Sequence, residues 1–213
     1  MIEFIEGRTL SAADLREGES LDRVASACRL LHSAAPFRDD FDMFEIQPAY
    51  LRIVGERDFR LPDRYREFEP RAALIRDALT EAPEPKVPCN NDLLAENFID
   101  DGERLRLIDY EYSGNNEASF ELGNIWSESA LSLEQLEELT TAYWGEPSPA
   151  KVARARLWGL MSKYGWTLWA SIQDGVSTID FDFWSWGMEK YERAVAEFDG
   201  PDFDRLLDQA RSG

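Results

Sequence analysis

The sequence predicts a mostly helical α+β fold that contains one β-hairpin. Apolar residues recur at helical spacing over Leu21 to His32 and again over Pro149 to Asp174, a pattern typical of helices that bury one face. The stretch from Phe98 to Ile108 departs from this spacing, because two short apolar runs flank an Asp-Asp-Gly turn. Such a turn between apolar runs is a strong hairpin signal.

The beginning of the chain is predicted to hold a strand and a helix. Ile2 to Leu10 alternates in polarity and is broken by Gly7, which predicts a short strand. Ser11 to Asp14 resembles a helix N-terminal cap, with Asp where Glu is usual. A helix should follow and end near Ser33.

The next segments are predicted to be loops and one clear helix. Ala35 to Pro70 is rich in Phe, Asp and Pro, and we expect loops with a short helix near Pro48 to Val54. Arg71 to Leu79 places its apolar residues on one face and should be helical. The proline-rich segment Pro83 to Pro88 closes that helix.

Three polar residues stand at the ends of the predicted hairpin. Asn97 precedes its first strand, Asp109 ends its second, and Asp92 lies on the loop that leads in. A hairpin brings its two ends together, so Asn97 and Asp109 should lie side by side. An amide and a carboxylate oxygen suit Mg²⁺. A separate Asp held near them could orient a hydroxyl nucleophile as a base.

The C-terminal half is predicted to be helical after one polar loop. Tyr110 to Glu117 is polar and should be that loop. Ser132 to Gln135 forms a capping box. The predicted helices cover Phe120 to Ala130, Ser132 to Trp144, Ser148 to Asp174, Trp184 to Phe198, and a short closing segment from Phe203 to Leu207.

The composition limits the partners of the protein. Its 213 residues carry a formal net charge of -19, which disfavours nucleic acid or an anionic membrane and favours a small cationic substrate. An alternative explanation of the net charge is that the acidic residues only keep the protein in solution. No apolar run is long enough to span a bilayer, and we expect a cytoplasmic protein.

Cysteine and histidine offer little for metal or nucleophile chemistry. Cys28 and Cys89 show neither a disulfide framework nor metal-binding spacing, so we expect reduced thiols. The one histidine, His32, lies in an apolar run and is predicted to be a packed helix-end residue rather than a ligand.

Three motifs stand in order between Val87 and Trp126. They are Asn90-Asn91-Asp92-Leu93 with Asn97, then Ile108 to Tyr112, then Phe120 to Asn124. They resemble H-N-D-L-x-x-x-N, I-D-[FYW]-E-Y and F-D-[LI]-[GA]-N, the motifs of the choline/ethanolamine kinase family of kinase-like phosphotransferases. This chain departs from the family at Asn90, where His is usual, and at Glu121, where Asp is usual. An amide can still donate and accept hydrogen bonds at position 90.

The resemblance implies an ATP-dependent phosphotransferase in which ATP is the co-substrate and Mg²⁺ the cofactor. Asp92 would be the catalytic base, and Asn97 and Asp109 would bind Mg²⁺. The catalytic loop would be supported by Asn90, Asn91 and Glu111.

The resemblance also implies a binding site for the ammonium group of choline or ethanolamine. Glu128 would be its acid, and aromatic rings would attract the cation. The same rings could equally be ordinary core residues, and Glu128 an ordinary solvated acid. The residues concerned are Glu128, Trp166, Trp169, Gln173, Phe183 and Trp186.

The resemblance further implies a division into residues 1–10 and residues 11–213. The first would be the last strand of the small lobe, with Phe4, Ile5 and Glu6 as the nucleotide hinge, and the second the helical large lobe. The glycine-rich loop and phosphate-binding Lys of an N-terminal ATP-binding lobe have no counterpart in these residues, so we expect weak ATP binding and slight turnover. We expect the lobe to stand alone or to form a homodimer through the strand edge Ile2 to Ile5.

Two alternatives remain open from the sequence. One is a non-catalytic module that binds quaternary ammonium compounds through its aromatic residues. The other is a kinase for an aminoglycoside or another small molecule. The choice between choline and ethanolamine is also open, because the width of an aromatic site cannot be inferred from the sequence.

Overall fold

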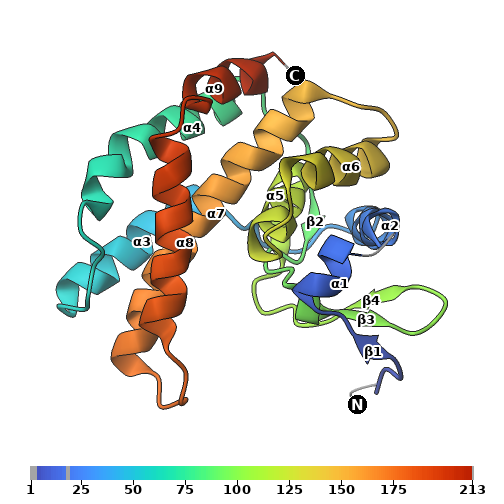
Figure 1. The fold of residues 1–213 in the computed structure, drawn as a ribbon, viewed down its shortest axis with the longest axis horizontal. Coiled ribbons are helices and arrows are strands. Elements are labelled where there is room, and N and C mark those ends of the chain that lie inside the picture. Colours follow the sequence, from blue (N-terminus) through green and yellow to red (C-terminus); the bar gives the residue numbers. More distant parts are fainter. Residues whose placement is uncertain (1–3, 18–19, 213) are drawn as a thin grey trace. The chain divides into compact units, whose positions relative to one another are not determined.

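The fold is seen in a computed structural model that describes residues 4–17 and 20–212 (Figure 1). The chain forms two compact units. The first comprises Met1–Phe41 and Glu84–Gly159, and the second comprises Asp42–Pro83 and Leu160–Gly213. The long helix α7 (Pro149–Val176) begins in the first unit and ends in the second.

The first unit combines helices with two small antiparallel sheets. One sheet has the order β1-β3-β4, and the other pairs β2 with β5. Its described helices and strands are β1 (Arg8–Thr9), α1 (Ala12–Glu17), α2 (Leu21–His32), β2 (Lys86–Cys89), the 3₁₀ turn η2 (Ala95–Asn97), β3 (Phe98–Asp100), β4 (Leu105–Leu107), β5 (Gly114–Glu117), α5 (Ala118–Glu128) and α6 (Leu133–Trp144).

The hairpin predicted at the centre of this unit is confirmed. Strands β3 and β4 pair antiparallel, with Phe98 opposite Leu107. The side chain of Asp101 accepts hydrogen bonds from the backbone N–H groups of Glu103 and Arg104, which closes the turn. Its carboxylate also accepts from Arg106 at 2.6 Å. The side chain of Asp101 therefore holds the turn in place.

Helices α2, α5 and α6 pack around one apolar core in the first unit. Leu93, which follows Asp92, and Phe98, which begins β3, are fully buried in this core with Leu122 and Ile125 of α5. At Gly123, α5 approaches α7 so closely that a Cβ would lie 2.1 Å from the carbonyl oxygen of Ala155. The segment after Asp92 and the hairpin therefore begin from a rigid base.

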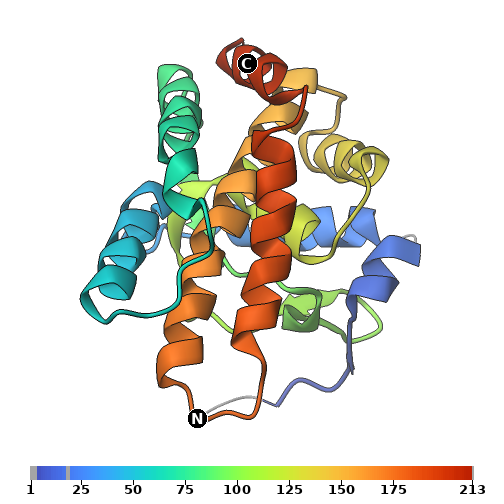
Figure 2. The same ribbon diagram turned by 60° about the vertical axis from the view of Figure 1, so that its left-hand side comes forward.

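The second unit is helical over its described residues. It contains α3 (Met43–Glu56), the 3₁₀ turn η1 (Tyr65–Phe68), α4 (Glu69–Glu81), the rest of α7, α8 (Phe183–Phe198) and α9 (Phe203–Arg211). Helix α8 runs along α7 (Figure 2), and a Cβ at Gly187 would lie 2.5 Å from that of Ala170. Stacked rings of Tyr65 and Tyr164, with centroids 4.1 Å apart, lie in its core.

Most helices predicted from periodicity and capping are confirmed. Asp14 accepts from the backbone N–H of Ser11 at 2.8 Å, as expected of a cap residue. Ser132 and Gln135 form the reciprocal capping box at the start of α6. Among the described residues, no helix is both long and apolar enough to cross a bilayer.

The prediction for Ala35 to Pro70 was wrong in extent. Instead of loops with a short helix, a 14-residue helix, α3, runs from Met43 to Glu56 with Pro48 inside it. The side chain of Asp42 caps it by accepting from the N–H of Phe44 at 2.8 Å. Its buried face includes the polar Gln47, which interrupts the apolar pattern in the sequence.

The loop predicted over Tyr110 to Glu117 was also wrong in part, because it contains strand β5. This strand pairs with β2, with Cys89 opposite Gly114. Its Gly-Asn-Asn-Glu sequence lacks the β-branched and aromatic residues that favour strands. Buried side-chain hydrogen bonds stabilise it instead, including one from the Asn115 amide to the oxygen of Phe37 at 2.9 Å.

The strand predicted over Ile2 to Leu10 is shorter than expected. Only Arg8–Thr9 forms a strand among the described residues, and it pairs with β3 of the hairpin. Phe4 to Glu6 have no regular structure. Ile2 lies outside the described residues, and the homodimer expected through the strand edge Ile2 to Ile5 stays a prediction.

Candidate functional site

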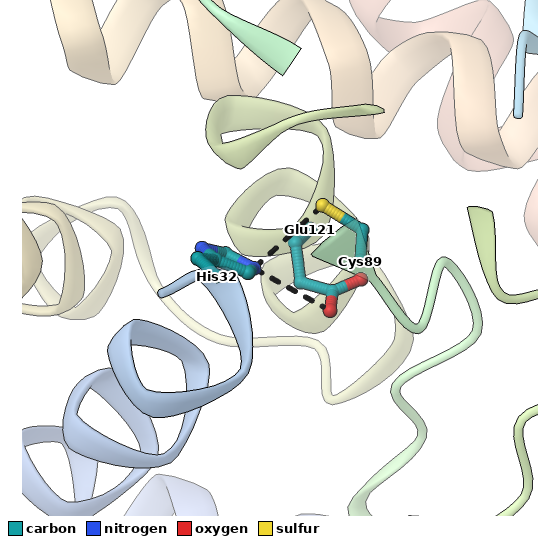
Figure 3. A group of neighbouring side chains, drawn as sticks. All are labelled: His32, Cys89 and Glu121. Carbon is teal, nitrogen blue, oxygen red and sulfur yellow. Dashed lines mark hydrogen bonds and ion pairs between the residues drawn. The ribbon is translucent and has the colours of Figure 1, made fainter. Parts of the chain in front are cut away.

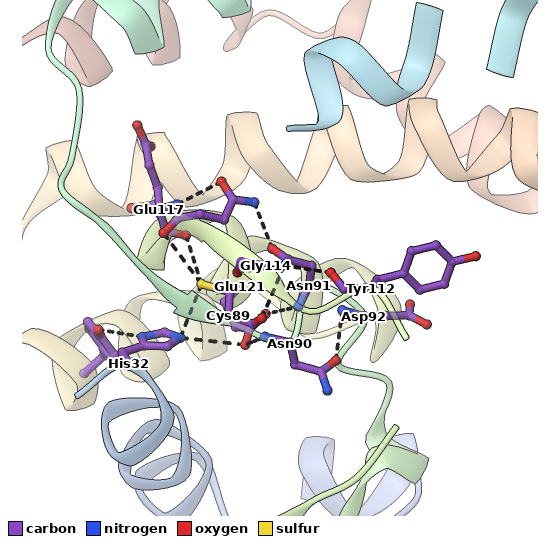
Figure 4. Close-up of polar contacts among 12 residues, drawn as sticks. His32, Cys89, Asn90, Asn91, Asp92, Tyr112, Gly114, Glu117 and Glu121 are labelled. Carbon is purple, nitrogen blue, oxygen red and sulfur yellow. Dashed lines mark hydrogen bonds and ion pairs between the residues drawn. The ribbon is translucent and has the colours of Figure 1, made fainter. Parts of the chain in front are cut away.

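The loop that carries Asp92 follows directly on strand β2. We call residues 90–92 the Asp92 loop. Asn91 has a φ of 68°, in the left-handed region that Asn tolerates better than most residues. The carboxylate of Glu121, on α5, accepts the N–H of Asn90 at 2.8 Å and that of Asn91 at 2.7 Å (Figure 4). One buried acid thus holds two successive peptide groups next to Asp92.

Asn90 connects this loop to the end of the hairpin. Its amide donates to the carbonyl oxygens of Ile108 at 3.2 Å and Asp109 at 2.7 Å. Its side-chain oxygen accepts the N–H of Asp92 at 3.1 Å. Asn90, in the position where the family motif usually has His, therefore provides both a hydrogen-bond donor and an acceptor.

Asn91 connects the loop to strand β5. Its amide donates to the carbonyl oxygens of Tyr112 and Gly114, at 3.0 and 3.2 Å. Its side-chain oxygen accepts from the amide of Asn116 at 2.9 Å. The contacts to Gly114 and Asn116 are buried and the one to Tyr112 is partly buried, so protein groups hold the loop from several sides.

The two ends of the hairpin meet beside the Asp92 loop. The N–H of Ile108 donates to the carbonyl oxygen of Asn97 at 3.1 Å, so Asn97 lies opposite Ile108, the residue before Asp109. The amide nitrogen of Asn97 donates to the backbone oxygen of Asp92 at 2.8 Å. This bond orients the Asn97 side chain and leaves its oxygen as the group that can accept a ligand.

Asp109 has an unusual backbone for an acid. Its φ is 58° and its side chain is exposed. A non-glycine residue in the left-handed region costs about 1–3 kcal/mol, and such residues cluster at functional sites. Asp92 is half-buried and Asn97 is buried. Amide and carboxylate oxygens at neighbouring positions fit Mg²⁺, which takes oxygen ligands and retains water and phosphate oxygens.

The remaining predicted residues of the first unit lie in varied surroundings. Glu111 is exposed, and Glu128 is half-buried at the C-terminal end of α5. Phe4 is 86% exposed in the irregular segment before β1. Within the first unit, hydrogen bonds join Asn97 to the backbone of Asp92 directly, and join Asp109 to Asp92 through Asn90.

The predicted aromatic residues belong to the second unit. Trp169 contacts Phe183 and Trp186 edge to face, with ring centroids 5.8 and 5.7 Å apart. These three residues and Gln173 are half-buried, whereas Trp166 is buried. We call Trp169, Phe183 and Trp186 the aromatic cluster. It joins the C-terminal part of α7 to the start of α8.

A second buried group adjoins the Asp92 loop and was not predicted as part of the site. The Nε2 atom of His32 lies 3.6 Å from the Cys89 sulfur and 3.7 Å from a Glu121 oxygen (Figure 3). Its Nδ1 atom lies 2.7 Å from the hydroxyl oxygen of Tyr143. His32 ends α2, as expected of a packed helix-end residue.

Three types of metal-binding side chain meet in this group, within 4.8 Å of one another. Hydrogen bonds within the protein already account for their arrangement, because both Glu121 oxygens accept backbone N–H groups. Burial and the nearby Glu121 carboxylate raise the pKa of the Cys89 thiol, so the sulfur is a thiol rather than a thiolate. We therefore assign the group to support of the loop. In the sequence, the only sign of this group was Glu121 in a motif position where the family usually has Asp.

Comparison with known proteins points to one family. A family model described as choline/ethanolamine kinase matches residues 1–143. Ethanolamine kinase 2 of Rattus norvegicus is 33% identical over 147 residues, which cover 59% of this chain and 38% of that protein. The chain thus spans about two-fifths of the length of this relative.

Solved structures show the same likeness. A choline/ethanolamine kinase family protein from Mesorhizobium loti superposes with a TM-score of 0.89 at 33% identity, over 99% of this chain and 72% of that one. Choline kinase LicA from Streptococcus pneumoniae gives a TM-score of 0.76 at 24% identity, over 97% and 69% of the two chains. The similarity to LicA shows a shared fold.

Proposed function

Because the chain belongs to the choline/ethanolamine kinase family, we propose that it transfers the γ-phosphoryl group of ATP to a small amino alcohol. Two contacts between the Asp92 loop and the ends of the hairpin support the proposal: the Asn97 amide donates to the backbone oxygen of Asp92 at 2.8 Å, and the Asn90 amide donates to the carbonyl oxygen of Asp109 at 2.7 Å. Family membership supplies the reaction, and this geometry supplies the groups that would perform it.

Asp92 is assigned to the hydroxyl of the acceptor. Its carboxylate accepts the hydroxyl proton and points the oxygen at the phosphorus, as expected of an orienting base. Two contacts hold its backbone: the Asn90 side chain on its N–H at 3.1 Å and the Asn97 side chain on its carbonyl at 2.8 Å. A base held in this way needs little reorganisation when the acceptor arrives.

Asn97 and Asp109 are assigned to Mg²⁺, which when bound would neutralise charge on the phosphates of ATP. The Asn97 side chain is oriented by its bond to the Asp92 backbone, so its oxygen is presented in one direction. Asp109 supplies a negative charge from an exposed position two residues after β4. Positioning and charge neutralisation, rather than a covalent intermediate, would lower the barrier.

The ammonium group of the acceptor is assigned to the aromatic cluster of the second unit. Glu128 of the first unit is assigned separately to substrate binding, as the family resemblance implies. The support for the aromatic cluster is the similarity of Trp166-x-x-Trp169-x-x-x-Gln173 to the family's C-terminal motif. The half-buried state of Trp169 agrees with a ring that is partly accessible. Phe4, Ile5 and Glu6 remain assigned to the nucleotide hinge, and residues 1–10 to the small-lobe strand.

The test is an assay of magnesium-dependent phosphorylation, monitored by ³¹P NMR, with choline, ethanolamine and an aminoglycoside as acceptors. We expect slow formation of a phosphorylated amino alcohol that falls about 100-fold or more in Asp92→Asn. Glu103→Gln, an exposed acid in the hairpin turn, is the matched control and should keep wild-type activity.

Calorimetry completes this test. Heat of Mg-ATP binding at millimolar concentration is expected with the wild-type chain. Absence of such heat, together with choline binding that survives Asp92→Asn, would refute the kinase proposal in favour of an ammonium-binding module. Turnover with the aminoglycoside alone would show that the acceptor is an aminoglycoside rather than an amino alcohol.

A further inference from the structure

The aromatic cluster already holds a cation of the protein itself. The Nζ atom of Lys190 lies 4.0 Å from the centre of the Trp186 ring. The two residues are four apart on α8 and therefore lie on the same face of that helix. Lys190 is only 5% exposed. A desolvated ammonium at this distance over an indole is a strong cation–π contact.

The position of Lys190 removes one ring face from the cluster. At 4.0 Å the ammonium is in van der Waals contact with the ring, so no second cation fits on that face. Trp186 also meets Trp169 edge to face, at an interplanar angle of 67°. Phe183 meets Trp169 at 75°. The rings thus pack largely on one another and on Lys190.

Quaternary and primary ammonium groups depend differently on such faces. A quaternary ammonium has no N–H, so it is bound by aromatic faces that surround its methyl groups. A primary ammonium has three N–H donors, so carboxylate and carbonyl oxygens can bind it with fewer ring contacts. A cluster with one face filled by lysine therefore suits the primary ammonium better.

We propose that Lys190, by covering one face of Trp186, is a specificity-determining residue that makes the acceptor a primary amino alcohol of the ethanolamine type. This rests on the proposed function, which assigns the cluster to the acceptor. It also adds a like charge near the ammonium site, and like charges repel most where water is excluded. Both effects act against choline more than against a small amine that can move away from the rings.

The experiment measures binding and turnover separately. Binding of tetramethylammonium and of methylammonium to the full chain is followed by tryptophan fluorescence without ATP. Turnover is compared as the ratio of kcat/KM for choline to that for ethanolamine. The variants are Lys190→Met, which keeps the length of the side chain without its charge, and Lys190→Arg, which keeps a cation over the ring.

The matched control is Arg60→Met. The Arg60 guanidinium lies 3.8 Å from the centre of the Trp184 ring. Trp184 is also on α8 but is not part of the aromatic cluster. The Arg60→Met variant therefore loses a cation–π contact of the same kind without changing the cluster. Thermal unfolding of each variant shows how far a change in selectivity is separate from a change in stability.

We expect wild type to bind methylammonium more tightly than tetramethylammonium. Lys190→Met should shift both the binding ratio and the turnover ratio about tenfold towards the quaternary compound, whereas Lys190→Arg and Arg60→Met should match wild type. Equal ratios in Lys190→Met and wild type would overturn the proposal. So would a wild type that prefers tetramethylammonium, a result that needs no variant to fold. A chain without phosphotransfer refutes the proposed function, and the binding ratio then decides the role of Lys190 alone.

Discussion

Replacing Glu121 by glutamine tests how the Asp92 loop is held in place. Each carboxylate oxygen of Glu121 accepts one backbone N–H, from Asn90 and Asn91. The residue is 0% exposed, so water cannot replace either bond. Glutamine keeps one oxygen but turns an NH₂ group, itself a donor, towards the second N–H.

The expected cost follows from these contacts. A hydrogen bond to a charged group contributes about 1.5–3 kcal/mol, and a buried donor left without a partner costs a similar amount. Glu121→Gln should therefore lower the free energy of unfolding by about 2–3 kcal/mol. Where the loss is confined to the loop, about 2.8 kcal/mol corresponds to a 100-fold increase in local opening.

Amide hydrogen exchange by NMR measures that opening at each residue, and urea unfolding measures the global cost. We expect exchange at Asn90 or Asn91 to accelerate about 100-fold in Glu121→Gln, with a fall in kcat as Asp92 loses its position. Glu96→Gln changes an exposed acid on the nearby η2 turn and is the control. Unchanged exchange at both amides, together with wild-type stability, would refute the assignment of Glu121 to loop support.

The remaining predictions concern other contacts in the fold. Gly123→Ala should lower the free energy of unfolding by about 3 kcal/mol or more in urea, because its Cβ would lie 2.1 Å from the Ala155 oxygen. Gly55→Ala, whose Cβ would meet nothing closer than 3.9 Å, should instead stabilise α3 by about 0.5–1 kcal/mol, and equal losses in the two variants would contradict this account. The backbone N–H of Arg104 and the side chain of Arg106 lower the pKa of Asp101 from 3.8 to about 2. Its charge therefore stabilises the hairpin above pH 4 and ceases to do so as the pH falls towards 2. The difference in Tm between wild type and Asp101→Asn should accordingly shrink between pH 5 and pH 2.5, and a difference that stays constant would show that the charge is not involved.

The sequence predicted those elements whose stability is local. The capping pair Ser132 and Gln135 and the turn after Asp100 depend on residues two or three apart, so both could be inferred without knowledge of the fold. The long helix α7 carries apolar residues through most of its length, and its first-turn Pro149 marked its start. In these cases local propensity and tertiary packing agree.

The sequence could not predict elements that depend on distant partners. Strand β5 has poor strand propensity, and its Glu117 is held by Arg154 and Trp158 of α7, about forty residues away along the chain. The contact of Glu121 with the Asp92 loop joins residues 30 apart. Lys190 on Trp186 was missed for another reason, since a lysine four residues after a tryptophan is common on a helix surface.

The central claim is that the oxygens of Asn97 and Asp109 meet at one divalent ion beside Asp92. Paramagnetic broadening of NMR signals by Mn²⁺, added with ATP to the full chain, measures this most directly, because Mn²⁺ takes the same oxygen ligands as Mg²⁺. The account predicts that signals of Asn97 and Ile108 to Tyr110 broaden first, and that the effect disappears in Asp109→Asn. Broadening centred on His32 and Cys89, or none near the hairpin at millimolar Mn-ATP, would contradict it.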